Sequence, residues 1–146
     1  MVKLVIVYDS QTGNTEKMAK AIKEGVESVG NVEVAFGKVD ESFLPQELES
    51  AAAVILGSPT HYGDVTLKMR AFIEAYGKSL RGKVGAAFGS WGWTGEAVDI
   101  LNKTLKSYGM NVVEPGIKAL STPDKTVLEE CRILGKTLAE RTRKPP

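Results

Sequence analysis

A short segment near the N-terminus has the composition of a phosphate-binding loop that works without cations. It reads Asp9-Ser10-Gln11-Thr12-Gly13-Asn14-Thr15 and lies between an apolar run and a helical pattern. Amides at a helix start and the helix dipole attract phosphate, Gly13 lets the backbone approach, and the hydroxyls donate further bonds. The loop has no Lys or Arg for a P-loop and no GxGxxG for a dinucleotide. The alternative is a plain helix start, with Thr15 or Asn14 as N-cap.

Two later loops combine glycine with aromatic residues. They read Gly57-Ser58-Pro59-Thr60-His61-Tyr62-Gly63-Asp64 and Gly89-Ser90-Trp91-Gly92-Trp93-Thr94-Gly95-Glu96. A planar ring with apolar faces and a polar rim fits such loops, because aromatic side chains cover its faces and loop amides read its rim. Tyr62 and either Trp91 or Trp93 are the candidates to stack on the two faces of the ring, with Trp91 favoured by its place in the loop. The alternative is that one tryptophan fills the core, as we expect of Tyr8.

Apolar runs predict the strands that position these loops. Residues 2–8, 51–56 and 83–88 are almost continuously apolar, which is typical of strands buried on both faces. Residues 32–36 alternate more and predict an edge strand. Residues 111–113 and 117–120 predict a last strand with a bend at Pro115-Gly116.

Helical patterns alternate with these runs. Apolar stripes recur at three- and four-residue spacing, most of them followed by a glycine stop. They comprise Met18, Ile22, Val26 and Val29; Met69, Phe72, Ile73 and Tyr76; Val98, Leu101, Leu105 and Tyr108; and Val127, Cys131, Leu134 and Leu138, with a weaker helix at 45–50. The alternation predicts an α/β fold, a mostly parallel sheet with helices on both faces. Ligands in such folds bind at the carboxyl ends of the strands, where the three loops fall.

Length and composition exclude several classes of protein. A chain of 146 residues with a net charge of +1 is one domain with no reason to bind nucleic acid or an anionic membrane. A single cysteine, Cys131, excludes a disulfide framework, and we expect it to be a small core residue. A single histidine, His61, excludes a His-rich metal site. No run reaches the roughly 20 apolar residues of a membrane span, and Asp9 cuts short any signal peptide. We therefore expect a soluble, cytoplasmic protein.

The run Ser10-Gln11-Thr12-Gly13-Asn14-Thr15-Glu16 after a strand resembles the flavodoxin loop that binds the monophosphate of FMN. The family's fold fits the whole alternation: a three-layer αβα sandwich with a five-stranded parallel sheet of order 2-1-3-4-5. Residues 117–120 lead straight to the last helix, which matches the short-chain form. We expect an FMN-binding domain over residues 1–140 and a basic tail over residues 141–146. The segments 57–60 and 88–97 look especially like the flavodoxin domain of flavodiiron proteins.

The resemblance implies FMN as the cofactor and no metal or catalytic residue. The implied FMN-binding residues are Ser10, Gln11, Thr12, Gly13, Asn14, Thr15, Ser58, Pro59, Thr60, His61, Tyr62, Gly63, Asp64, Gly89, Ser90, Trp91, Gly92, Trp93, Gly95 and Glu96. Gly63 matches the glycine peptide that flips in flavodoxins and stabilises a neutral semiquinone. We expect Asp64, Glu96 and Asp99 to disfavour the anionic, fully reduced flavin. His61 either contacts the flavin edge, gates protonation or faces solvent.

The implied function is electron transfer between redox proteins, a reductase donor and an oxidoreductase acceptor, by a monomer. The alternative is an FMN enzyme on the same fold, of the quinone reductase or protoporphyrinogen oxidase type. A phospho-signalling receiver is excluded, because the third strand ends in Gly57-Ser58 where a receiver needs aspartate. A subunit serving a separate diiron partner remains a further alternative. Typical flavodoxins are strongly acidic, so the net charge of +1 departs from the family.

Overall fold

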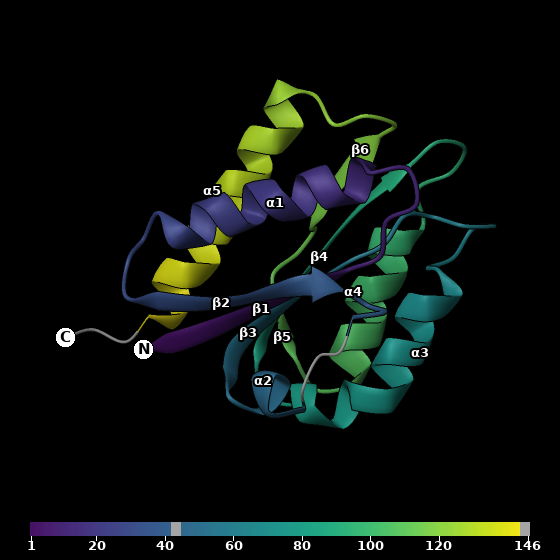
Figure 1. Cartoon of the computed structure of the whole chain (residues 1–146). Coiled ribbons are helices and arrows are strands. Elements are labelled where there is room, and N and C mark those ends of the chain that lie inside the picture. The colour runs from purple at the N-terminus through teal and green to yellow at the C-terminus, as the bar shows by residue number, and fades with distance from the viewer. Residues whose placement is uncertain (42–44, 144–146) are drawn as a thin grey trace.

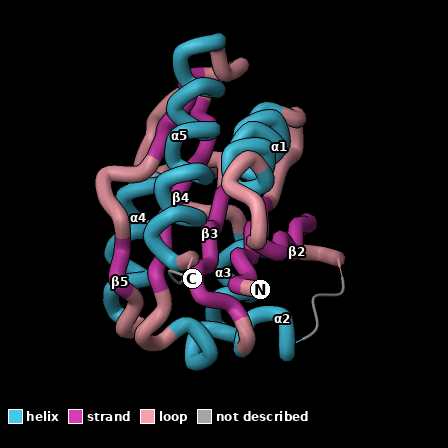
Figure 2. The backbone as a smooth tube through the Cα atoms, turned by 90° about the vertical axis from the view of Figure 1, so that its left-hand side faces the viewer, coloured by secondary structure: helices cyan, strands magenta, loops and turns pink. Residues whose placement is uncertain are grey.

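The sheet of the computed structural model, which describes residues 1–41 and 45–143, has the expected order. Its strands are β1 (Val2–Tyr8), β2 (Val32–Lys38), β3 (Ala51–Gly57), β4 (Val84–Trp91), β5 (Asn111–Val112) and β6 (Ile117–Leu120). All pairs are parallel, the order is β2-β1-β3-β4-β5, and β6 also pairs with β4. The strands labelled in Figure 2, β2, β3, β4 and β5, follow this order across the sheet. The predicted order and the bent last strand are confirmed.

Helices cover both faces of the sheet (Figure 1). They are α1 (Asn14–Glu27), α2 (Pro45–Glu49), α3 (Leu67–Tyr76), a 3-10 turn (Gly77–Leu80), α4 (Ala97–Ser107) and α5 (Lys125–Thr142). Helices α1 and α5 lie side by side on one face, with α3 and α4 on the other. Glycines permit the close approach of α1 and α5, since a Cβ at Gly25 would collide with the carbonyl oxygen of Arg132 and one at Gly135 with that of Ile22.

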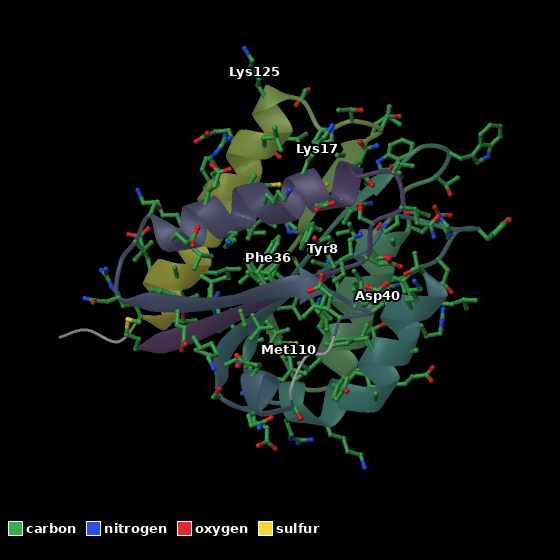
Figure 3. The ribbon with its side chains drawn as sticks, viewed as in Figure 1. Tyr8, Lys17, Phe36, Asp40, Met110 and Lys125 are labelled. Carbon is green, nitrogen blue, oxygen red and sulfur yellow. The ribbon has the colours of Figure 1, made fainter. Side chains whose placement is uncertain are left out.

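Alternate residues of β1 supply the two halves of the core, as the two-residue period of a strand requires. Leu4, Ile6 and Tyr8 face the α1–α5 layer, whereas Val5 and Val7 face the α3–α4 layer. The expectation that Tyr8 is a core residue is confirmed: it is buried, and its ring lies 5.3 Å from that of Phe36 (Figure 3). Burial raises the pKa of Tyr8 to about 12, with a further contribution from the Glu16 carboxylate.

Several boundaries differ from the expected ones, and those of β4 and α5 bear on the site and the tail. Strand β4 continues to Trp91 rather than ending at residue 88, because Phe88 to Trp91 pair with Ile117 to Leu120 of β6. Helix α5 extends to Thr142, two residues into the expected tail, and residues 144–146 of that tail lie outside the described residues. Within the described part of the chain, no helix has the length and apolar character needed to cross a membrane.

Candidate functional site

The three predicted loops meet around one cavity at the carboxyl ends of the strands. Its volume is about 290 Å³. Eleven residues from four segments line it: Gln11, Thr12, Asn14, Thr15, Pro59, Thr60, His61, Ser90, Trp91, Gly92 and Ser121. All but Ser121 are residues that the sequence predicted for the site. Segments far apart in the chain are therefore brought together where an open α/β sheet binds its ligands.

The first loop is already shaped for an anion. Gly13 precedes α1 with a φ of 93°, a left-handed conformation that glycine adopts without penalty. The Ser10 hydroxyl accepts hydrogen bonds from the amides of Gly13 at 3.2 Å and Glu16 at 3.3 Å, which tightens the loop. Within residues 1–41 and 45–143, the amides of Asn14 and Thr15 have no acceptor. Unpaired amides at the start of a long helix, together with hydroxyls, suit a phosphate group.

A buried hydroxyl pair joins the first loop to the end of β4. The hydroxyl oxygens of Thr15 and Ser90 lie 2.8 Å apart, and both side chains are buried. The amide of Thr60 donates to the carbonyl of Ser90 at 3.0 Å, so the second loop is tied to the same point. The Thr60 hydroxyl in turn accepts from the amide of Ala97 at the start of α4, at 3.1 Å. These bonds set the spacing of the three loops.

The second loop ends in a tight turn that projects an aromatic ring into solvent. His61 and Asp64 exchange backbone hydrogen bonds at 2.7 and 3.0 Å, and Tyr62 and Gly63 between them have φ values of 50° and 74°. A tyrosine in this region is unusual and costs free energy. The Tyr62 side chain is fully exposed. It is therefore available to cover a ligand or contact a partner.

The two tryptophans of the third segment have different surroundings. Trp91 ends β4, is half-buried and lines the cavity, and a Cβ on Gly95 would lie 3.1 Å from its ring. Trp93 lies two residues further in the loop and is 92% exposed. Of the two, only Trp91 can form a wall of the cavity in this arrangement.

Comparison with known proteins decides the family. A sequence model of the flavodoxin family matches residues 6–135, which is most of the chain. The chain belongs to the flavodoxin family. Flavodoxins are FMN-binding electron-transfer proteins that act with redox partners.

Its relatives include short flavodoxins and larger enzymes. It is 35% identical to a flavodoxin of Clostridium saccharobutylicum, covering 97% of this chain and 98% of that protein. It superposes on an archaeal flavodoxin with a TM-score of 0.93 at 38% identity, covering 98% of this chain and 100% of that one. It is also 34% identical to the rubredoxin-oxygen oxidoreductase of Megalodesulfovibrio gigas, over 94% of this chain but 35% of that protein. The chain thus spans about a third of the length of the larger relatives.

The residues present fit FMN. The first loop offers amides and hydroxyls for a phosphate monoester, and the cavity continues to the half-buried face of Trp91, a surface for a flat ring. Within residues 1–41 and 45–143, no group of His, Cys, Asp or Glu could hold a metal ion. A larger hollow of about 840 Å³ lies at the opposite end of the sheet, lined in part by Met1, Asn31 and Thr142. It contains none of the three loops, so chemistry rather than size identifies the flavodoxin site.

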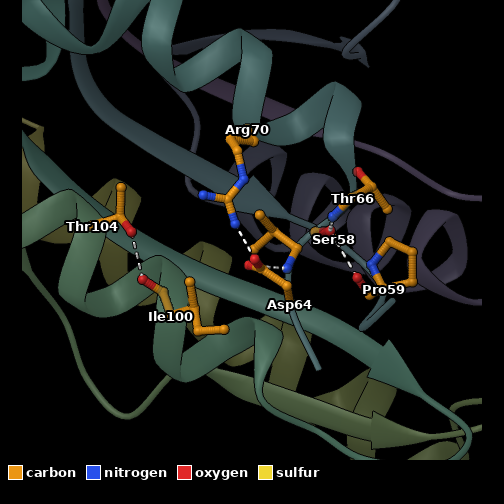
Figure 4. Close-up of polar contacts among 8 residues, drawn as sticks. Ser58, Pro59, Asp64, Thr66, Arg70, Ile100 and Thr104 are labelled. Atoms are coloured by element: carbon orange, nitrogen blue, oxygen red, sulfur yellow. Dashed lines mark hydrogen bonds and ion pairs between the residues drawn. The ribbon is translucent and has the colours of Figure 1, made fainter. Parts of the chain in front are cut away.

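Several residues implied by the flavodoxin resemblance have other contacts. The buried Ser58 hydroxyl donates to the carbonyl of Pro59 at 2.8 Å and accepts from the amide of Thr66 at 3.1 Å (Figure 4). A Cβ on Gly89 would collide with the carbonyl oxygen of Ser58, so that glycine serves the close approach of β4 and the second loop. The roles of Ser58 and Gly89 in the structure are thus to hold the loops; contact of either with FMN stays a prediction.

The acids around the flavodoxin site are largely paired. Asp64 forms an ion pair with Arg70, and the Asp99 carboxylate accepts from Lys118 at 2.7 Å. Among the described residues Glu96 alone of the three acids has no ion pair, and its Oε2 lies close to Gly63. Ion pairing of Asp64 and Asp99 weakens their expected effect on the reduced flavin, and that effect stays a prediction. Glu96 is the remaining uncompensated charge.

Sequence reasoning did not single out two residues at this edge. Ser121 lines the cavity from the loop after β6, with a φ of 57° and its amide bonded to the carbonyl of Trp91. Asp9 is buried directly after β1, and its Oδ2 has no hydrogen-bond partner within the described ranges. Only the pairing of β6 with β4 brings Ser121 here, and no local motif marks it. The position of Asp9 beside the phosphate-type loop was the available signal for that residue.

Proposed function

We propose that this flavodoxin-family chain carries electrons singly, at low potential, from a reductase to an oxidoreductase. The observation that supports it best is the cavity itself. At about 290 Å³ it falls at the small end of ligand sites, and Tyr62 and Trp93 lie exposed beyond it. A flavin held there would keep one edge at the protein surface. Electrons can then pass directly to a docked protein.

The proposal gives each segment of the site a role. The amides of residues 12–15, with the hydroxyls of Ser10, Thr12 and Thr15, hold the phosphate, and their neutrality explains why no cation is needed. Trp91 covers one face of the ring and Tyr62 the other, while Gly63 and Glu96 lie against its polar rim. When bound, FMN supplies the one-electron chemistry. The chain binds it, orients it and keeps water from part of it.

The same proposal addresses the departure from an acidic surface. Of the acids near the cavity, Asp64 and Asp99 are each paired with a cation, whereas Trp93 and Tyr62 are exposed. Contact with partners through aromatic side chains needs little net charge, and such residues are enriched at interfaces. We propose that the protein acts as a monomer. We also place it in the cytoplasm, since its one cysteine is a buried thiol that needs no oxidising compartment.

The visible spectrum of the purified protein tests this function. We expect a yellow protein whose flavin fluorescence is quenched, which releases FMN rather than FAD and accepts electrons in two separate steps during a reductive titration. A colourless protein that ignores added FMN would overturn the proposal. Rapid steady-state oxidation of NAD(P)H with a quinone, in the absence of any other protein, would favour the enzyme alternative instead.

A further inference from the structure

The turn from His61 to Asp64 has a conformation that its own sequence does not favour. Tyr62 and Gly63 both have left-handed φ values, and the Tyr62 side chain is too exposed to be fixed by packing. The two backbone hydrogen bonds between His61 and Asp64 close the turn, but both partners belong to the turn, so these bonds do not attach it to the rest of the molecule. A restraint from outside the turn is needed to fix the position of Tyr62.

Asp64 provides that restraint through both of its carboxylate oxygens (Figure 4). Oδ1 accepts a hydrogen bond from the amide of Val65 at 2.6 Å, and Oδ2 forms an ion pair with a guanidinium nitrogen of Arg70. Val65 is buried, so one side of the carboxylate is attached to the α3–α4 core. Arg70 reaches the other side from the first turns of α3.

Helix α3 is itself firmly placed, so Arg70 projects from a fixed base. The amide of Thr66, its N-cap, donates to the buried Ser58 hydroxyl at 3.1 Å. The Thr66 hydroxyl accepts from the amide of Met69 at 3.3 Å, and Met69 is completely buried beside Arg70 in the sequence. The start of the second loop, the start of α3 and the tip of the turn are thereby linked in one chain of contacts.

We propose that Arg70 is a positioning residue, which acts through Asp64 to hold the His61–Asp64 turn against α3. The ion pair has two consequences at the cavity rim. It keeps Tyr62 and Gly63 in place before a ligand arrives, which lowers the cost of ordering them on binding. It also cancels the charge of Asp64 next to the flavin. The flavin part of this inference rests on the proposed function, whereas the restraint on the turn does not.

An ordinary surface ion pair would look similar but behave differently. Arg70 and Asp64 side chains are 48% and 39% exposed, and pairs of that kind add little to global stability. Melting temperature therefore cannot distinguish the two cases. Local opening of the turn can, because the amide of His61 is protected by its bond to the Asp64 carbonyl.

The test compares Arg70→Gln, Asp64→Asn and the double variant in the full chain, with and without FMN. Hydrogen exchange of the His61 amide, read by NMR, should become about two- to fivefold faster in all three, the factor expected for loss of a half-exposed pair. Arg70→Lys, which keeps the charge, should restore part of the protection. Lys68→Gln is the matched control: it removes a cation from the same helix and breaks the exposed pair with Asp40 at 3.3 Å.

The flavin readouts separate position from charge. In Arg70→Gln, FMN should bind about two- to fivefold more weakly, and the second reduction potential should become more negative because Asp64 is left uncompensated. The double variant should recover the potential but not the protection of His61. Unchanged exchange in both single variants, equal acceleration in Lys68→Gln, or faster exchange with unaltered FMN affinity would each overturn the inference. A chain that binds no FMN yet shows the exchange effects would contradict the proposed function alone.

Discussion

The hydroxyl groups of Thr15 and Ser90 lie 2.8 Å apart in the interior although 75 positions separate them in the chain. Thr15 belongs to the first turn of α1, next to the phosphate-type loop, and Ser90 belongs to β4 just before Trp91. One short contact therefore fixes the distance between the part of the site suited to a phosphate and the part suited to a ring. Neither hydroxyl has solvent to replace the other.

Removing either hydroxyl should destabilise the protein by leaving its partner unpaired. We expect Thr15→Val and Ser90→Ala each to lower the free energy of unfolding by about 1–2 kcal/mol, and the double variant to lose clearly less than the sum. Urea denaturation of the FMN-free protein measures all three. Thr104→Val is the control: its hydroxyl bonds to the carbonyl of Ile100 within α4, at 2.8 Å, so its loss should cost no more than about 0.5 kcal/mol. Additive losses would show that the two hydroxyls do not depend on each other.

Gly13 and Gly30 offer a matched pair for testing the phosphate loop. Both have left-handed φ values, 93° and 79°, and in both cases a Cβ would meet no atom within 4 Å. Each change to alanine should therefore cost a similar backbone strain of about 1–2 kcal/mol. Only Gly13→Ala should weaken FMN binding, by about tenfold, the equivalent of one phosphate hydrogen bond.

Riboflavin, which lacks the phosphate, is the ligand control for this comparison. Its affinity should be nearly the same in Gly13→Ala and the unchanged protein, because riboflavin has no phosphate group for the loop of Gly13 to bind. Fluorescence titrations of both flavins against both variants provide the measurement. Equal loss of FMN and riboflavin affinity would argue that the loop shapes the whole cavity rather than the phosphate subsite.

The elements of the fold were predictable because hydrophobic period and glycine stops are local signals. The apolar run that ends at Tyr8, and the stripe from Met18 to Val26, each specify their own geometry. The end of β4 was not predictable in this way. Its extension to Trp91 depends on pairing with β6, and no residue near Trp91 indicates that this segment pairs with a strand some 30 positions later.

The site shows the same division between local and distant causes. The first loop could be predicted because its hydroxyls, Gly13 and the helix start are adjacent in the sequence. The contacts of Asp64 and Ser58 could not, since they depend on Arg70 and Thr66 reaching back from α3. From the sequence, a carboxylate next to an aromatic loop cannot be distinguished from an unpaired charge, because the cation that pairs with it lies on another element. For that reason the sequence could not show that Asp64 and Asp99 each form an ion pair.

Cys131 should be inert as a thiol and should make stability depend on alkaline pH. Burial raises its pKa to about 12 in the folded protein, whereas the unfolded thiol ionises near pH 9. The stabilisation that the protonated Cys131 thiol adds to the free energy of unfolding is therefore complete below pH 9. It is lost as the pH rises toward 12, because in this range only the unfolded chain releases the thiol proton. By pH 10.5 the loss should reach about 2 kcal/mol.

The measurement is the free energy of unfolding between pH 8 and 10.5 for the unchanged protein and Cys131→Val. With rising pH, the free energy of unfolding of the unchanged protein should fall faster than that of Cys131→Val. A thiol reagent at pH 8 should label Cys131 only after denaturation. Rapid labelling of the folded protein, or parallel pH curves for the two proteins, would contradict the burial of this side chain.

Trp91 and Trp93 should divide their roles between cofactor and solvent. Trp91 is half-buried in the cavity wall, so Trp91→Leu should weaken FMN binding by about tenfold through loss of an aromatic face and its contact area. Trp93 is 92% exposed, so Trp93→Leu should change FMN affinity less than about twofold. Acrylamide should quench Trp93 efficiently, and added FMN should quench Trp91 more strongly.

Because Trp91 also pairs with Leu120 in the sheet, urea unfolding of each FMN-free variant is needed to separate lost binding from lost stability. If Trp93→Leu weakened FMN binding more than Trp91→Leu did at equal stability, the loop from Gly92 to Gly95 would have to close over the ring, and Trp93 rather than Trp91 would be its cover.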